Sequence, residues 1–235
     1  EGLIANTGLI FENGGEEGFW VPTALAEAEG LVTIEDALAR PDLFPHPEKD
    51  GVGGFWGCPA GWNCQITTTQ MFKAYDMASK GFEYIDPGSG GALTASLDSS
   101  MNKGDNWFGY YWGPTSILGR YDLTKLDEGV EHNAETWISE INNLEVENPG
   151  KNRYPSSTVE SYVGQNMLDN FIVMDYLKKR SYPNKLTSVF LAWIDENQAD
   201  GQMAAEYFIT EHEDVWKNWT SADARLAIKK EFGML

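Results

Sequence analysis

Four short apolar runs, each bounded by glycine, proline or polar residues, occur in the first half of the chain. Runs of this length and composition predict short buried strands, which we place at residues 18–23, 54–58, 81–86 and 107–112. Segments with the apolar spacing of a helix lie between them, over residues 23–30, 65–78 and 92–102. This alternation of strand and helix predicts an α/β fold.

Local signals mark where several of these helices begin and end. Gly30 follows a short helical pattern and predicts its end. Thr33, with Asp36 three residues later, predicts a helix start with an acidic first turn. Asn63 is the expected cap of the helix that begins near Gln65.

The pattern changes in the second half of the chain. Residues 127–158 are polar and rich in turn-forming residues, and we interpret them as a long insertion that contains one short helix. From about residue 165 the chain consists of successive amphipathic segments. The pattern therefore predicts two parts, a mixed α/β part over residues 1–165 and a helical part over residues 166–235.

Charge narrows the possible partners. The chain has 235 residues with 36 acidic and 17 basic side chains, a formal charge of −19 and a mean hydropathy of −0.40. Such a surface repels phosphate backbones and anionic lipid, so we expect no nucleic-acid partner. No apolar run is long enough to insert directly into a membrane. The first ten residues lack the pattern of a signal peptide, so we expect that a targeting segment was removed or never present.

Few residues suggest catalysis or metal binding. His46, His132 and His212 lie in unrelated contexts, and none accompanies a nucleophile motif. The PGSGG segment (87–91) lacks the lysine of a phosphate-binding loop, which favours a simple strand-to-helix turn. The acidic loop 48–50 lacks the spacing of a calcium-binding EF-hand, so calcium there stays an open alternative. We predict no enzyme, no cofactor and no metal site.

The aromatic residues are more informative, above all in CPAGWNC (58–64), which holds the only two cysteines. A close pair of cysteines favours an oxidising compartment, and closing so short a loop would stabilise the chain by roughly 2–2.5 kcal/mol. Trp62 and Trp112 each follow a predicted strand, and ligands of open α/β sheets bind at strand ends. The two indoles could form walls that hold a cation without hydrogen-bond donors. The alternative is that they are ordinary core tryptophans.

The segment GCPAGWNC (57–64) resembles the disulfide-and-tryptophan signature of periplasmic glycine betaine-binding proteins, the substrate-binding components of ABC importers. The similarity continues through residues 65–77 and 81–97. It includes YYWGP (110–114), which resembles the Trp-x-Pro element of that family, and it returns in the helical tail from about Leu186. About two thirds of the chain takes part.

This resemblance implies a two-lobed Venus-flytrap fold of the periplasmic-binding-protein class, type II-like. Residues 1–165 would form mostly the second lobe, and residues 166–235 would belong to the first. The family begins its first lobe with a further segment that carries another Trp-x-Pro wall, so the resemblance implies an incomplete first lobe here. Trp137, Tyr154 and Glu131 in the insertion are candidates to replace that wall.

The resemblance also assigns roles to individual residues. Cys58 and Cys64 would form a disulfide, and Trp62 and Trp112 would be two walls of an aromatic box, with Tyr111 beside the second wall. The backbone amides of Asn63 and Cys64 would bind the negative end of the ligand, as a helix N-terminus favours.

The expected ligand is a small quaternary ammonium or N-oxide osmolyte: glycine betaine, choline, carnitine, dimethylsulfoniopropionate or trimethylamine N-oxide. We expect a monomeric periplasmic protein that delivers this ligand to the membrane permease of an ABC importer. Two alternatives stay open, a binding protein for another small polar solute and an α/β enzyme.

Overall fold

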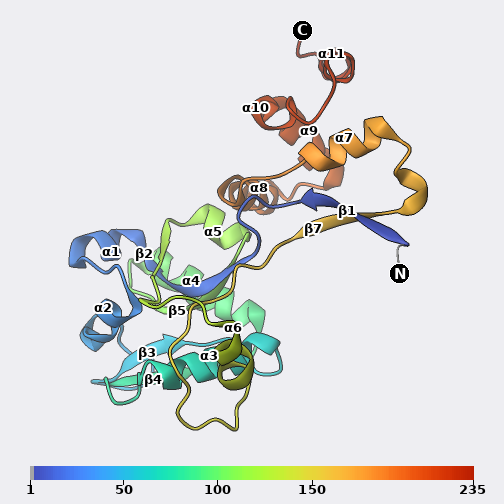
Figure 1. Cartoon of the computed structure of the whole chain (residues 1–235). Coiled ribbons are helices and arrows are strands. Elements are labelled where there is room, and N and C mark those ends of the chain that lie inside the picture. Colours follow the sequence, from blue (N-terminus) through green and yellow to red (C-terminus); the bar gives the residue numbers. More distant parts are fainter. Residues whose placement is uncertain (1–2) are drawn as a thin grey trace. The chain divides into compact units, whose positions relative to one another are not determined.

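The structure is a computed structural model that describes residues 3–235, and its elements are labelled in Figure 1. The chain forms two compact units, each assembled from separate segments. Unit 1 comprises Glu1–Glu16, Gly113–Arg120 and Ser156–Leu235, and unit 2 comprises Glu17–Trp112 and Tyr121–Pro155. Both the N-terminal residues and 113–120 thus fall in one unit with the C-terminal helices, whereas the sequence pattern placed a single division near residue 165. The assignment of each unit to a lobe remains a prediction.

Unit 2 is built on a five-stranded sheet with the order β4-β3-β5-β2-β6. Strands β3 (Gly53–Trp56), β4 (Phe82–Ile85) and β5 (Gly109–Gly113) run parallel, while β2 (Glu16–Pro22) and β6 (Leu123–Lys125) pair antiparallel. The four strands expected from the apolar runs are all present. The α/β prediction is confirmed.

Four helices of unit 2 join these strands: α1 (Thr23–Glu29), α2 (Ile34–Leu38), α3 (Asn63–Ala74) and α4 (Gly90–Lys103). A short 3-10 turn, Pro41–Leu43, follows α2. Gly30 ends α1 in the left-handed conformation, and Thr33 and Asp36 form a reciprocal capping box on α2. These local predictions are confirmed because both devices use only groups that lie within one helical turn of each other.

The predicted cap of α3 was wrong by one residue. Trp62 occupies the N-cap position and Asn63 is the first helical residue, since the Gln65 amide already donates to the Trp62 carbonyl at 3.1 Å. The helix also ends at Ala74, four residues before the expected Ala78. Asp76 then adopts a positive φ of 51°, which the helix cannot continue through.

Aromatic rings lie at the centre of the core of unit 2. Phe55 on β3 contacts Phe19 and Phe108 with ring centroids 4.7 and 5.1 Å apart, and both pairs meet edge to face. Edge-to-face contact is the favoured geometry because the ring edge is positive and the face negative. All three rings are almost fully buried, so the apolar strands of the sheet meet in one packed centre.

Most of the predicted insertion, up to Pro155, folds as part of unit 2, and its last three residues belong to unit 1. It contains one short helix, α6 (Ala134–Thr136), which continues directly into a π-helical turn, Trp137–Ile141. The Gln70 side-chain amide on α3 donates to the carbonyls of Glu140, Asn143 and Val146 at 3.1, 2.6 and 2.9 Å. The buried Gln70 amide thus supplies the hydrogen-bond donor for three backbone carbonyls of this irregular segment and holds the segment in place.

Unit 1 contains a two-stranded antiparallel ribbon of β1 (Ile4–Leu9) and β7 (Glu160–Gly164), visible in Figure 1. A 3-10 turn, Gln165–Met167, follows β7. Its helices are α5 (Ser116–Arg120), α7 (Phe171–Lys179), α8 (Asn184–Asn197), α9 (Gly201–Glu211), α10 (Glu213–Trp216) and α11 (Ala222–Glu231). The helical character expected after residue 165 is confirmed.

An aromatic cluster stabilises the helices of unit 1. Trp193 stacks on Tyr207 with centroids 3.8 Å apart, and Phe208 stacks on Trp219 at 5.8 Å. Trp216 and Trp219 are buried. These tryptophans therefore serve packing, Trp216 at the end of α10 and Trp219 in the turn that follows it.

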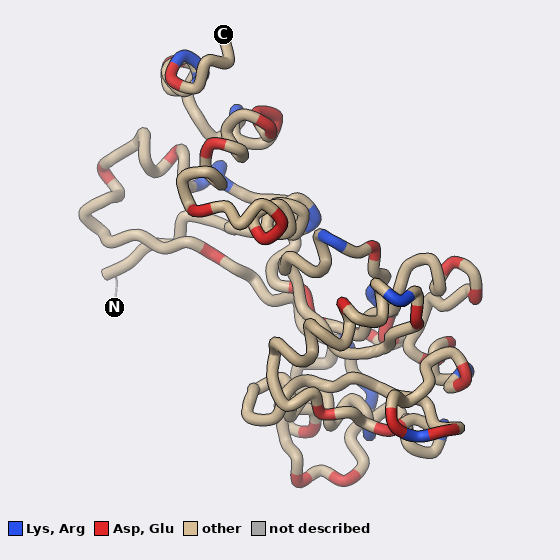
Figure 2. Tube along the Cα trace, turned by 180° about the vertical axis from the view of Figure 1, so that it is seen from behind, with Lys and Arg blue, Asp and Glu red and all other residues tan. Residues whose placement is uncertain are grey.

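Charge is distributed along both units, with acidic residues outnumbering basic ones (Figure 2). Within residues 3–235 no helix combines the length and apolar character needed to cross a bilayer. The same residues contain no cluster of three or more His, Cys, Asp or Glu side chains placed to hold a metal ion.

Candidate functional site

The CPAGWNC turn of unit 2 connects β3 to α3. Cys58 and Cys64 form the predicted disulfide, with Cα atoms 5.7 Å apart. Gly61 adopts a φ of +86°, which favours glycine, and this lets the loop reverse between the two cysteines. Within the turn the Trp62 amide donates to the Pro59 carbonyl at 3.3 Å, and the Ala60 amide donates to Asp86 Oδ1 at 3.3 Å. The turn is thus held covalently and by hydrogen bonds.

A buried hydroxyl on α3 holds both ends of this turn from below. Thr68 Oγ1 accepts from the Cys58 amide at 3.3 Å and donates to the Cys64 carbonyl at 2.9 Å. It also shares a hydrogen bond with the Tyr84 hydroxyl of β4 at 2.8 Å. Because Thr68 is fully buried, replacing it would leave several polar groups unsatisfied.

Trp62 projects from this turn and leaves 43% of its surface exposed. Its ring lies over Gly90, the first residue of α4, where an added Cβ would come within 2.7 Å of the indole. This contact explains part of the PGSGG segment, since glycine at position 90 makes room for the Trp62 ring. The structure therefore gives the segment a packing role as a strand-to-helix turn.

Trp112 lies beside Trp62, near the end of β5. The two indole centroids are 5.4 Å apart and the ring planes meet at 64°. The sequence predicted that two strand ends would bring these side chains together, and the structure places them in direct contact. The two rings meet edge to face and form a corner, in which Trp62 is exposed and Trp112 is partly buried.

Tyr111 lies behind Trp112. Its ring stacks on the indole at 4.7 Å with an interplanar angle of 11°, and only 2% of the residue is exposed. Its hydroxyl shares a 2.7 Å hydrogen bond with Thr94 of α4, and its carbonyl accepts from Trp20 Nε1 at 3.1 Å. Burial raises the pKa of the Tyr111 hydroxyl. In this position Tyr111 supports the second indole from below.

The N-terminus of α3 supplies hydrogen-bond donors near the indoles. Asn63 and Cys64 are its first two residues, and the Trp62 side chain makes no capping hydrogen bond. The first amides of an α-helix have no acceptor within the helix, and the helix dipole adds positive potential there. An anionic group is the natural partner for such amides.

Sequence reasoning missed the layer behind the indoles. The Tyr110 hydroxyl donates to Glu17 Oε1 at 2.6 Å, and its ring stacks near Trp112 at 6.2 Å. Burial, reinforced by the Glu17 carboxylate, raises the pKa of the Tyr110 hydroxyl. Because these partners lie 93 positions apart in the sequence, no local pattern indicates their contact.

The insertion also reaches this layer. Tyr154 is buried and its ring lies 6.2 Å from Tyr110 and 5.2 Å from Trp137. Its hydroxyl faces Thr67 without a hydrogen bond of ordinary geometry. Glu131 is exposed on the same segment. Tyr154 therefore packs behind Tyr110. Its use as a replacement for the missing aromatic wall of the ligand site stays a prediction.

These features define a binding scaffold of the α/β class, with aromatic faces and helix amides at strand ends. The profile of the substrate-binding domain of ABC-type glycine betaine transport systems matches residues 8–211. The chain belongs to this family. The resemblance stated from the sequence is thereby confirmed, and the family consists of transport proteins that bind substrate.

Solved structures show the same fold. ProX, the glycine betaine/L-proline-binding protein of Borrelia burgdorferi, aligns with a TM-score of 0.54 and 20% identity over 96% of this chain and 73% of its own. A choline-binding protein in complex with choline aligns with a TM-score of 0.54 and 17% identity, over 98% of this chain and 73% of its own. Lactococcal OpuAC in complex with glycine betaine aligns with a TM-score of 0.53 and 18% identity, over 93% of this chain and 71% of its own. No curated protein matches the chain. At these identities the structural similarity establishes the fold alone.

Proposed function

We propose that this protein binds a small quaternary ammonium or N-oxide osmolyte and delivers it to the permease of an ABC importer. The observation that carries this proposal is the corner of Trp62 and Trp112, 5.4 Å apart, beside the N-terminus of α3. The family of the chain and the choline and glycine betaine named in two similar structures support the same ligand class.

In this proposal the positive end of the ligand contacts the two indole faces. A trimethylammonium group offers no hydrogen-bond donors, so attraction to the π faces replaces hydrogen bonding. Each face contributes roughly 0.5–2 kcal/mol. Tyr111 and Tyr110 act indirectly, because their stacking holds Trp112 in place.

The negative end of the ligand binds the amides of Asn63 and Cys64. The disulfide and the Thr68 hydroxyl hold these donors at a constant distance from Trp62. A zwitterion whose charges match this distance benefits at both ends. We therefore propose glycine betaine as a tighter ligand than choline, which has an uncharged CH2OH group in place of the carboxylate.

The experiment is calorimetric titration with glycine betaine, choline and trimethylamine N-oxide. We expect Trp62→Ala and Trp112→Ala each to weaken binding about 2- to 30-fold, the range that one cation–π face supplies. Trp56→Ala is the control, since it removes a half-buried tryptophan of unit 2 that lies outside the indole pair, and it should leave osmolyte affinity unchanged. Affinity that survives both indole substitutions would refute the site assignment.

Three further outcomes bear on the rest of the proposal. Binding of aromatic or cyclic solutes in preference to methylammonium compounds would favour another small polar ligand. Chemical turnover of a ligand would favour an enzyme. On the basis of the family we also propose export to the periplasm, a monomeric state and interaction with a permease, and size-exclusion chromatography tests the monomeric state.

A further inference from the structure

A cavity of about 650 Å³ lies in unit 2, and neither Trp62 nor Trp112 lines it. We call it the Trp56 cavity. The loop 42–47, the end of β3, the last turns of α4 and the following turn 103–106 line it. Helix α4 connects the two places, because its first residue, Gly90, lies under Trp62 and its C-terminal half lines the cavity. The two ends of this helix are about 20 Å apart.

One wall of the Trp56 cavity is a polar face of α4. Ser96, Ser99, Ser100 and Lys103 follow one another at helical spacing and point to the same side. The Ser96 hydroxyl is already engaged, since it accepts from Trp107 Nε1 at 3.1 Å and donates to the Leu93 carbonyl at 2.7 Å. Within residues 3–235, the hydroxyls of Ser99 and Ser100 and the Lys103 ammonium have no hydrogen-bond or ion-pair partner. These groups are available to a ligand.

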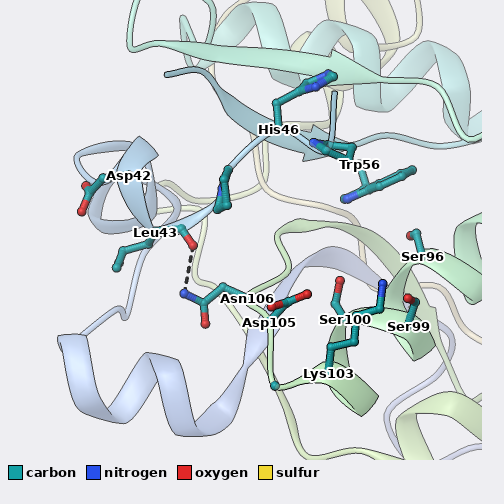
Figure 3. A pocket seen from close by; sticks show the side chains of 13 residues that line it. Asp42, Leu43, His46, Trp56, Ser96, Ser99, Ser100, Lys103, Asp105 and Asn106 are labelled. Atoms are coloured by element: carbon teal, nitrogen blue, oxygen red, sulfur yellow. Dashed lines mark hydrogen bonds between the residues drawn. The ribbon is translucent and has the colours of Figure 1, made fainter. Parts of the chain in front are cut away.

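The opposite wall is the indole of Trp56 (Figure 3). Trp56 is the last residue of β3 and the one residue of that strand that is only half-buried. An indole offers a flat apolar face, against which the C–H groups of a ligand ring can pack. The cavity therefore combines one apolar face with hydrogen-bonding groups on the other side.

Charged residues of both signs line the cavity, so it favours neither an anion nor a cation. Lys103 and Asp105 are both present but form no ion pair with each other. Asp42 is held by Arg40 through two hydrogen bonds of 3.0 and 2.9 Å. Asn106 Nδ2 donates to the Leu43 carbonyl at 2.9 Å and joins the two sides of the cavity (Figure 3). Since the whole chain carries a formal charge of −19, binding of a simple anion in the cavity is disfavoured as well.

A neutral polyol satisfies this arrangement best. Each ring hydroxyl both donates and accepts, so it can bond to a serine hydroxyl, a carboxylate or an ammonium alike. One face of a pyranose ring carries C–H groups suited to stacking on an indole. The cavity volume lies within the usual range of roughly 300–1,000 Å³ for small-molecule sites. We propose that the Trp56 cavity binds a neutral saccharide of one or two pyranose rings, stacked on Trp56 and hydrogen-bonded by Ser99, Ser100, Lys103 and Asp105.

The test is saturation-transfer NMR of the full chain with D-glucose, maltose and trehalose as probes. We expect saturable binding of at least one saccharide, with signal strongest at protons of the stacked face. Ser99→Phe fills the cavity from a half-buried helix position and should weaken binding at least about tenfold, a loss of about 1.4 kcal/mol. Ala95→Phe adds the same ring to an exposed position of α4 that does not line the cavity, and it should leave saccharide binding unchanged.

Trp56→Ala gives an independent measurement, with circular dichroism to confirm that the variant is folded. It should abolish saccharide binding and retain osmolyte binding, whereas Trp62→Ala should weaken osmolyte binding and leave saccharide binding unchanged. If Trp56→Ala does not fold, Ser99→Phe alone decides. The proposal is overturned if no probe binds saturably, if Ser99→Phe and Ala95→Phe behave alike, or if the site takes only amino-acid zwitterions such as glycine.

Discussion

The two units differ in how they bury their apolar side chains. In unit 2 the rings of Phe19, Phe55 and Phe108 meet at the centre of a five-stranded sheet. In unit 1 the only sheet among residues 3–235 is a two-stranded ribbon, and Phe171 and Ile172 leave 81% and 83% of their surface exposed. Two-stranded ribbons have little stability of their own. Unit 1 therefore depends mainly on contacts between helices, while unit 2 has a continuous core.

This difference explains where the candidate site lies. Trp62 and Trp112 are attached to strand ends and a disulfide turn of unit 2, and buried tyrosines support the second indole from behind. Binding groups are positioned more accurately on rigid elements than on mobile loops. The densely packed unit 2 is thus the better scaffold for the two indoles, because they contribute to ligand binding only if the distance between them is maintained.

The largest expected effect comes from comparing one ring in each unit. Phe55→Ala should lower the free energy of unfolding of unit 2 by about 3–5 kcal/mol, because it leaves a cavity in a fully buried cluster. Phe171→Ala should change the stability of unit 1 by no more than about 0.5 kcal/mol, since the ring is exposed. Guanidinium denaturation followed by circular dichroism measures both, and similar losses would contradict the contrast between the units.

Removal of the disulfide should have the next largest effect and should act on unit 2. The double variant Cys58→Ser with Cys64→Ser is expected to destabilise it by roughly 2–2.5 kcal/mol, the chain-entropy value for so short a loop. Hydrogen exchange should increase in the first turn of α3 and stay constant in α8 to α11. Faster exchange in the helices of unit 1 would show that the two units are not independent.

Helix caps allow a matched comparison of smaller size. The Ser89 hydroxyl accepts from the Ala92 amide at the start of α4, and the Ser221 hydroxyl accepts from the Ala224 amide at the start of α11. Each alanine substitution removes about 1 kcal/mol of helix stability. Since α4 buries leucines and α11 has no buried residue, Ser89→Ala should shift global unfolding while Ser221→Ala should only increase exchange within α11. Equal global shifts would contradict this.

Two carboxylates should give pH dependences of opposite sign. Burial raises the pKa of Glu128 in unit 2, so its contribution is present at low pH and is lost as the pH rises through that folded value. Hydrogen bonds from Asn6, and then Tyr162, lower the pKa of half-buried Glu160 in unit 1, so its smaller contribution is lost as the pH falls. Glu128→Gln and Glu160→Gln should flatten these two slopes in unfolding measured between about pH 3 and 7. A slope unchanged by either variant would refute the corresponding assignment.

Much of the secondary structure could be predicted because its signals are local. The capping box of Thr33 and Asp36 and the left-handed Gly30 act within one helical turn. The cap of α3 was misplaced by one residue, since asparagine is the more common cap but the helix here already begins at Asn63, inside the disulfide loop. The extent of the units was also not evident, because residues 113–120 pack with α8 across a gap of about 70 positions.

The candidate site divides in the same way. The sequence by itself determined the disulfide turn, the pair of tryptophans at strand ends and the family, since each depends on a short motif or on the order of elements. Only the tertiary structure decided that Tyr111 is buried behind Trp112, that Tyr110 donates to Glu17, and that the indoles meet edge to face. Those contacts join residues far apart in the chain. Their geometry results from how strands and helices pack, for which a local pattern of residues carries no signal.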